Sequence, residues 1–186
     1  GEITTDNSGM WTYDDRYGAV AQANSGETGW LLTPAKDLRG MKSVNLSFLH
    51  VHKYAGTFTD DMTLWVCANY KGSVGASQWQ QLTISPYSAN TNWTFVSVSI
   101  NVPLNMVGAN TVFGFKYTSS NSSAKWEIKE LNLNAECAKA DETTTTDVTA
   151  TPNEDNSVTL TWPAVNGADT YTIEIKKNGV LVCTLV

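Results

Sequence analysis

The chain has 186 residues, 41% of them hydrophobic, and a formal net charge of -6 at pH 7. This length fits one full domain and part of another, and no apolar run approaches the ~18–20 residues of a membrane-spanning helix. Lysine and arginine form no basic cluster along the chain, which makes nucleic acid a poor partner.

The first half of the chain shows the two-residue hydrophobic period of β-strands. Residues 17–23 predict a first strand, and a loop with Gly and Asn leads from it into a strand around Trp30. Over residues 44–51 apolar and polar residues alternate, so that one face of the strand is apolar. The alternation breaks at Leu49, which predicts a bulge or a strand buried on both faces.

The same period continues to residue 134. Further strands are predicted over residues 61–70, 79–84, 93–102, 111–118 and 124–134. The parity of the pattern changes between Phe95 and Val96, which predicts a second bulge. No segment has the spacing of an amphipathic helix over 11 residues. The sequence therefore predicts an all-β, jelly-roll-like β-sandwich of about eight to ten strands in two sheets.

Five segments carry a resemblance to a known family. Residues 30–38, WLLTPAKDL, followed by LSFLH at 46–50, resemble the core of the choice-of-anchor J and cleaved-adhesin type β-sandwich domains of Bacteroidetes surface proteins. Residues 61–70 and the pair 115–120 and 125–128 resemble later strands of the same family. The resemblance covers roughly residues 10–135 in the expected order. It implies an extracellular or cell-surface location and no particular activity.

A second module is predicted after residue 147. Residues 138–147 contain four consecutive threonines beside acidic residues and are predicted to be a linker between a domain over 1–137 and a module over 148–186. In the module, apolar residues alternate over 158–162 and 171–175, and Asn178-Gly179 predicts a two-residue hairpin. This part resembles the first half of a fibronectin type III, immunoglobulin-like module.

The apolar faces of residues 148–186 have consequences for assembly. Three more strands would be expected beyond Val186 to cover them, and isolated pieces of two to four strands are marginal in water. We therefore expect this module to be ordered by packing on residues 1–135 or by self-association along its open edge.

Cysteine and histidine give no predicted catalytic site. Cys67, Cys137 and Cys183 lack metal or redox spacing and are interpreted as buried free thiols. His50 and His52 share one face of a strand and could bind a metal or exchange protons, but their parity is that of the core, which favours buried, hydrogen-bonded histidines. No nucleophile motif or phosphate loop is present, so no enzyme is predicted.

Acidic residues suggest two further kinds of site, a pair of glycosidase carboxylates and a calcium site. The doublets at 14–15 and 60–61 could supply glycosidase carboxylates, but adjacent residues on a strand point in opposite directions, so neither doublet forms such a pair alone. The resemblance implies a structural calcium ion, which binds carboxylate and carbonyl oxygens. The acids nearest the family-like strands are Asp60, Asp61 and Glu127, which form the predicted calcium ligands.

Aromatic residues are the strongest functional signal, with 7 Trp and 7 Tyr. Sugars stack on aromatic rings that lie outside the core. The tryptophans within strand patterns are predicted to be core residues: Trp30, Trp65, Trp126 and Trp162. The aromatic residues at strand ends or in turns are the predicted ligand-binding set, with covering the end of the sandwich as the alternative role: Trp11, Tyr13, Trp79, Tyr87 and Trp93. Replacing Trp11 or Trp79 is accordingly expected to leave the melting temperature nearly unchanged.

These observations predict a non-catalytic extracellular binding or adhesin module that recognises a glycan or a surface protein. A structural spacer in a multidomain cell-surface protein is the alternative. A glycoside hydrolase accessory or catalytic domain is a weaker alternative, because it would require distant carboxylates or the two histidines to converge in a cleft.

Overall fold

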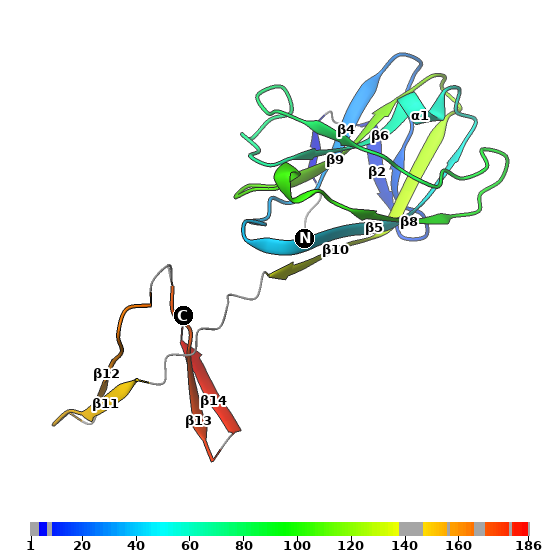
Figure 1. Cartoon of the computed structure of the whole chain (residues 1–186). Helices are drawn as coiled ribbons and strands as arrows, with labels where there is room; N and C mark the ends of the chain where they lie inside the picture. The colour runs from blue at the N-terminus through cyan, green and yellow to red at the C-terminus, as the bar shows by residue number, and fades with distance from the viewer. Residues whose placement is uncertain are drawn as a thin grey trace. The chain divides into compact units, whose positions relative to one another are not determined.

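A computed structural model describes residues 4–6, 9–137, 147–155, 157–165, 170–178 and 180–185 (Figure 1). The chain divides into two compact units, Gly1–Ala138 (unit 1) and Lys139–Val186 (unit 2), each of which is considered by itself. None of the helices in these residues has the length and apolar character needed to cross a bilayer.

Unit 1 is an all-β, jelly-roll-like sandwich of two five-stranded sheets, as predicted. Sheet 1 has the order β1 (Thr4–Asp6), β4 (Thr28–Leu32), β9 (Val112–Thr118), β6 (Met62–Cys67) and β7 (Gln80–Leu82). Sheet 2 has the order β2 (Trp11–Asp14), β3 (Gly18–Ala21), β10 (Lys125–Cys137), β5 (Met41–Lys53) and β8 (Val96–Asn101). Two short helical turns complete the unit, α1 (Phe58–Asp61) and the 3-10 helix η1 (Leu104–Met106).

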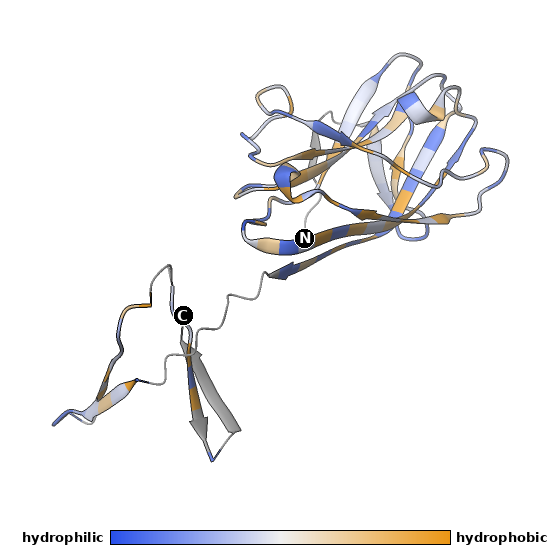
Figure 2. Ribbon diagram, viewed as in Figure 1, coloured by the Kyte–Doolittle hydropathy of each residue, from blue (hydrophilic) through white to orange (hydrophobic). Residues whose placement is uncertain are grey.

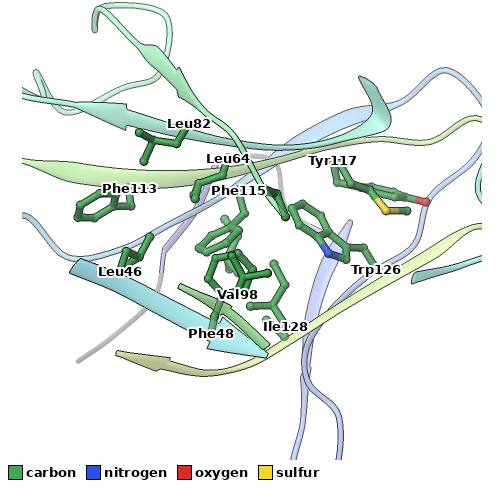
Figure 3. Close-up of a cluster of buried hydrophobic side chains, with 14 of the residues drawn as sticks. Leu46, Phe48, Leu64, Leu82, Val98, Phe113, Phe115, Tyr117, Trp126 and Ile128 are labelled. Atoms are coloured by element: carbon green, nitrogen blue, oxygen red, sulfur yellow. The ribbon is translucent and has the colours of Figure 1, made fainter. Parts of the chain in front are cut away.

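Side chains from both sheets fill the space between them (Figure 3). Phe48 of β5 meets Phe115 of β9 edge-on at a centroid distance of 5.1 Å, and Phe115 contacts Trp126 of β10 at 5.8 Å. Because these rings come from opposite sheets, they hold the sheets together, and burying each phenylalanine contributes roughly 1.5–3 kcal/mol. The predicted inward face of β9 is confirmed, since Phe113, Phe115 and Tyr117 are all buried.

The irregularity predicted near Leu49 lies on the neighbouring strand β10. Leu49 pairs with Lys129 and Ser47 pairs with Asn132, so β10 has one residue more than β5 between these pairs. Glu130 in this bulge has a φ of 53°, in the left-handed region. On β5 itself the alternation of buried and half-buried residues holds from Val44 to His50, and beyond it His50, Val51 and His52 are all buried, so the end of this strand is buried on both faces, which was the alternative prediction.

Two strands near the N-terminus, β1 and β2, were not predicted. Only Trp11 of the four residues of β2 is buried, and a strand with one buried residue shows no two-residue period. The predicted second bulge at Phe95 is also wrong. The change of parity there marks the start of β8, which pairs with β5 in an unbroken register from Val96.

The described residues of unit 2 form two antiparallel hairpins. β11 (Thr149–Pro152) pairs with β12 (Val158–Thr161), and β13 (Ile173–Lys177) pairs with β14 (Val180–Leu185). The hairpin predicted at residues 178–179 is confirmed, with a φ of 53° at Asn178. Trp162, which was predicted to be a core residue, is half-buried and contacts Tyr171 at 5.5 Å. The predicted linker, apart from Asp147, lies outside the described residues, as do the side chains of Cys137 and Cys183.

Candidate functional site

The outer face of sheet 2 has charged side chains at its centre. Trp126 and Ile128 of β10 point into the core, so the residues that alternate with them point outward. These outward residues are Lys125, Glu127 and Lys129. Figure 2 shows the same alternation of hydrophilic and hydrophobic residues along the neighbouring strand β5. Sheet 2 therefore presents three outward charges on one strand.

The outward residues of β5 extend this row. Lys53 pairs directly with Lys125 across the two strands, and Val51 pairs with Glu127. Lys53 places its Nζ atom 4.8 Å from the ring centroid of Tyr54 and 5.6 Å from that of Trp93. The fold thus brings together a third lysine and two aromatic rings beside the charges of β10.

Exposed aromatic rings flank the charged row on both sides. Tyr54 is 54% exposed and Trp93 is 41% exposed, and their rings contact each other at 6.3 Å. On the β2 side, Tyr17 is 40% exposed. Tyr13 is 76% exposed, but it lies two residues from the inward-facing Trp11 and pairs with the buried Ala19, so its side chain lies on the inner side of this edge strand. The predicted exposure of Tyr13 and Trp93 is therefore confirmed.

A groove of about 500 Å³ lies beside β2, β3 and β10. The residues that line it include Thr12, Tyr13, Asp14, Tyr17, Lys125 and Glu127. Asp14 Oδ1 accepts hydrogen bonds from the backbone N–H groups of Arg16 at 2.8 Å and Tyr17 at 3.0 Å, which fixes the turn that carries Tyr17. Tyr13 and Glu127, which were predicted for different roles, share this groove.

Burial of Glu127 among the outward side chains changes its acidity. The side chain is 6% exposed, and this burial raises the pKa of its carboxyl group. The nearby charge of Asp14 raises this pKa as well, whereas the charges of Lys125 and Lys129 lower it. Glu127 is thus a partly desolvated acceptor on the wall of the groove, suited to accept hydrogen bonds from a hydroxyl group.

Amide and hydroxyl groups continue the outer face beyond the bulge. Asn45 Nδ2 donates to Ser99 Oγ at 3.0 Å and to Asn101 Oδ1 at 2.9 Å. Asn132 and Asn134 of β10 pair with the β5 residues next to them. Such groups can both donate to and accept from the hydroxyl groups of a sugar.

Two of the predicted ligand-binding residues lie in the interior instead. Trp11 is only 6% exposed and contacts Trp126 at 5.8 Å, because its position in β2 points toward the core. Tyr87 is half-buried, its ring contacts His50 at 5.5 Å, and its hydroxyl group donates to the Met62 carbonyl oxygen at 2.7 Å. The prediction for Trp11 is therefore wrong, and Tyr87 fills the end of the core.

Trp79 belongs to a cluster on the opposite side of unit 1. Its ring lies 5.0 Å from that of Trp30, which contacts Trp65 at 6.1 Å. All three are half-buried on the outer face of sheet 1, so the prediction that Trp30 and Trp65 are core residues is wrong. The rings lie over Gly114 of β9, where a Cβ atom would be 2.8 Å from Trp30 Cε3 and 3.1 Å from Trp79 Cζ3.

We expect Gly114→Ala to displace the Trp30 and Trp79 rings and to destabilise unit 1 by about 1–3 kcal/mol, because the added methyl group overpacks the cluster. Tryptophan fluorescence during urea unfolding measures both effects. Gly75→Ala is the matched control, since a Cβ atom there meets no atom of the described residues within 4 Å. Equal stability of the two variants would show that the rings move aside without cost.

The two histidines are buried and hydrogen-bonded, as predicted. Trp126 Nε1 donates to His50 Nδ1 at 3.1 Å, so the proton of this neutral ring lies on Nε2, which donates to the Pro86 carbonyl oxygen at 3.0 Å. His52 Nδ1 lies 2.8 Å from Ser88 Oγ. Desolvation lowers the pKa of both rings, to about 4 for His52. Neutral, enclosed rings are structural parts of the core.

The three predicted calcium ligands are not gathered into one site. Asp60 and Asp61 lie in α1, whereas Glu127 lies on the outer face of sheet 2. Within the part of the chain that the structure describes, no group of three or more His, Cys, Asp or Glu residues could hold a metal ion. One oxygen of Asp61, Oδ2, is nevertheless buried and finds no hydrogen-bond partner in the described parts of the chain. Calcium binding stays a prediction.

Comparison with known protein families and with curated proteins gave no match. Among solved structures, the K1 cleaved adhesin domain of Lys-gingipain from Porphyromonas gingivalis W83 has a TM-score of 0.43 at 13% identity, over 72% of this chain and 83% of that one. The xylan-binding module CBM15 has a TM-score of 0.42 at 14% identity, over 74% and 94%. The enzymatically active domain of bacteriophage CBA120 tailspike protein 4 has a TM-score of 0.43 at 13% identity; the match covers 72% of this chain and 18% of the tailspike chain.

Proposed function

We propose that unit 1 is a non-catalytic binding module that recognises a glycan on the outer face of sheet 2. The observation that carries this proposal is the arrangement of exposed rings, Tyr17 on one side and Tyr54 and Trp93 on the other, around a polar strip. An extracellular or cell-surface location belongs to the same proposal and is supported by the sequence resemblance.

The chemistry of the face matches that of a saccharide. A sugar ring has apolar C–H faces, which stack on aromatic rings, and hydroxyl groups at its edge, which need partners that donate and accept. Glu127 and the amides of Asn45 and Asn132 supply such partners between and beside the rings. A protein partner would instead favour a more continuous apolar surface, so a surface protein is the second candidate ligand.

Hydrolysis of a glycan is the weaker candidate function. Glu127, with its raised pKa, and Asp14 line the same groove, which is the combination of residues that glycosidases use. Asp14 Oδ1, however, already accepts two backbone hydrogen bonds and closes a turn, which is a structural role. Release of reducing sugars by the intact chain, lost in Glu127→Gln, would support this candidate.

The proposal also includes a role for unit 2. A fibronectin type III-like module that presents unit 1 on a multidomain cell-surface protein is supported by the two hairpins and by the sequence resemblance. Self-association through residues 148–186 belongs to the same proposal and is supported by the exposed Val158 and Ile175 side chains. Analytical ultracentrifugation of the intact chain over a range of concentrations tests it.

We expect Trp93→Ala to weaken glycan binding by about tenfold or more, because truncating an aromatic ring on which a ligand stacks removes over 1 kcal/mol. A glycan array selects the ligand, and calorimetric titration of the intact chain measures the loss. The melting temperature should change little, since Trp93 is exposed.

Trp79→Ala is the matched variant on the other sheet and should bind normally. Loss of binding in Trp79→Ala with full binding in Trp93→Ala would move the glycan site to sheet 1. No glycan bound by the unaltered chain would refute the proposed function. Repeating the titration after chelation tests whether calcium is needed.

A further inference from the structure

We infer that the glycan is an acidic polysaccharide and that Lys53 and Lys125 bind its carboxylate or sulfate groups. This inference rests on the glycan-binding function proposed above. It concerns the charge of the ligand, which the aromatic rings alone do not select.

The first observation is the position of the two lysines. Lys53 and Lys125 are directly paired across antiparallel strands and point to the same face. The Cβ atoms of such pairs are about 4.5–5.5 Å apart, and like charges at this separation destabilise a sheet. An anion held between the two ammonium groups would convert this repulsion into attraction.

The second observation is the lack of counter-ions. Among the described residues, the ion pairs within 4.0 Å are Arg39–Asp37 and Lys42–Glu136, so no carboxylate oxygen lies this close to Lys53, Lys125 or Lys129.

The acids on the same face do not neutralise it. Glu127 lies between Lys125 and Lys129 along β10, and Asp14 lies at the β2 edge with one oxygen engaged by backbone N–H groups. Three lysines against two acids leave a local positive excess on a chain whose formal net charge is -6.

The third observation is how the ammonium groups are held. The Nζ atom of Lys53 lies near the Tyr54 and Trp93 rings, and that of Lys129 lies 4.1 Å from the ring centroid of Phe95. These cation–π contacts restrict the side chains while leaving their N–H donors free for an anion. A cation beside an exposed ring also matches an acidic sugar, which joins an apolar face to a charged group.

A polysaccharide suits this face better than a nucleic acid. Nucleic-acid binding depends on many lysine and arginine contacts along a strongly basic surface, whereas this face combines three lysines with two acids. The amide and hydroxyl strip around Asn45 and Asn101 instead offers partners for the hydroxyl groups that accompany the acidic groups of a polysaccharide.

The test is a set of calorimetric titrations of the full chain against polymers that differ only in charge. Polygalacturonate is compared with its neutral methyl ester, and dextran sulfate with dextran. We expect an acidic polymer to bind about tenfold or more tightly than its neutral partner, with an affinity that falls as salt rises. The first pair reports carboxylate recognition and the second reports sulfate recognition.

Lys53→Gln/Lys125→Gln should lose about tenfold or more in affinity for the acidic polymer, because two charge-assisted contacts are removed. Lys36→Gln/Lys71→Gln removes the same charge from exposed positions off this face and should bind normally. Circular dichroism of both variants verifies folding.

Equal affinity for acidic and neutral polymers, no binding to either acidic polymer, or equal losses in the two double variants would overturn the acidic ligand. A single-stranded oligonucleotide bound as tightly as the acidic polymer would overturn it too. If neutral glycans still bind in a Trp93-dependent way, only the charge preference fails. The glycan site itself then stands.

Discussion

Trp11→Ala is expected to lower the free energy of unfolding of unit 1 by about 3–5 kcal/mol, the usual cost of removing a large aromatic ring from a core. The Trp11 ring is buried against Trp126 and Tyr117, at centroid distances of 5.8 and 6.3 Å. Its loss would leave a cavity between β2 of sheet 2 and β9 of sheet 1. Urea unfolding followed by circular dichroism measures the difference.

The control lies two residues along the same strand. Tyr13 is 76% exposed, so Tyr13→Ala should change the free energy of unfolding by no more than about 0.5 kcal/mol. Similar small effects in both variants would place Trp11 outside the core. Its indole N–H is buried and has no hydrogen-bond partner among the described residues, which lessens the net contribution of this side chain but does not offset the loss of its packing.

Acid is expected to destabilise unit 1 by roughly 3 kcal/mol between about pH 6.5 and pH 4, through the two core histidines. The pKa of His52 falls from 6.5 to about 4 in the folded state, and that of His50 is also lowered. The unfolded chain therefore binds more protons than the folded chain in this range. Stability is present above the unfolded pKa and is lost as the pH falls toward the folded one.

The urea midpoint measured across this pH range tests the expectation, with His52→Asn as the matched variant. Asparagine can keep the hydrogen bond that His52 Nδ1 makes with Ser88 Oγ, yet it cannot take up a proton. The variant should be less stable at pH 7 and should lose less stability in acid. Burial raises the pKa of Glu127, which opposes the trend in part, because the folded chain then takes up that proton first. A midpoint that does not fall in acid would contradict the role of the histidines.

The architecture of unit 1 could be predicted from sequence because its central strands are long and regularly patterned. Phe113, Phe115 and Tyr117 alternate without interruption, and His50 and His52 extend the parity of their strand. Such a pattern reports directly which face is buried. It works for strands with several buried residues and fails for the edge strand that holds Trp11.

The candidate site was only partly predictable. Tyr13, Trp93 and Glu127 were singled out, but nothing in the linear order of residues shows that Tyr13 and Glu127 line one groove or that Trp93 lies beside a lysine next to it. Lys53 and Lys125 become neighbours only because β10 pairs with β5, and the sequence separates them by more than half the domain. A basic patch formed by residues of different strands cannot be recognised by searching the sequence for consecutive charged residues.

The prediction that the tryptophans of sheet 1 are core residues was wrong for a different reason. Trp30 and Trp65 lie in apolar stretches, which normally indicate an inward orientation. The absence of a side chain at Gly114 makes room for large rings on the outer surface instead. The type of a residue indicates whether its side chain can be buried. The residues of the neighbouring strand determine on which face of the sheet that side chain is buried.

The bulge at Glu130 also bears on how this domain can diverge over evolutionary time. It reverses the alternation of β10, so that Trp126 and Ile128 before it and Leu133 after it all face the core. Deleting this single residue would move the apolar side chains of one half of β10 from the core face of the sheet to the outer face. Substituting Asn132 would not change any core residue. Descendants of this chain can therefore acquire new ligands through point substitutions along β10, while insertions and deletions in that strand are selected against.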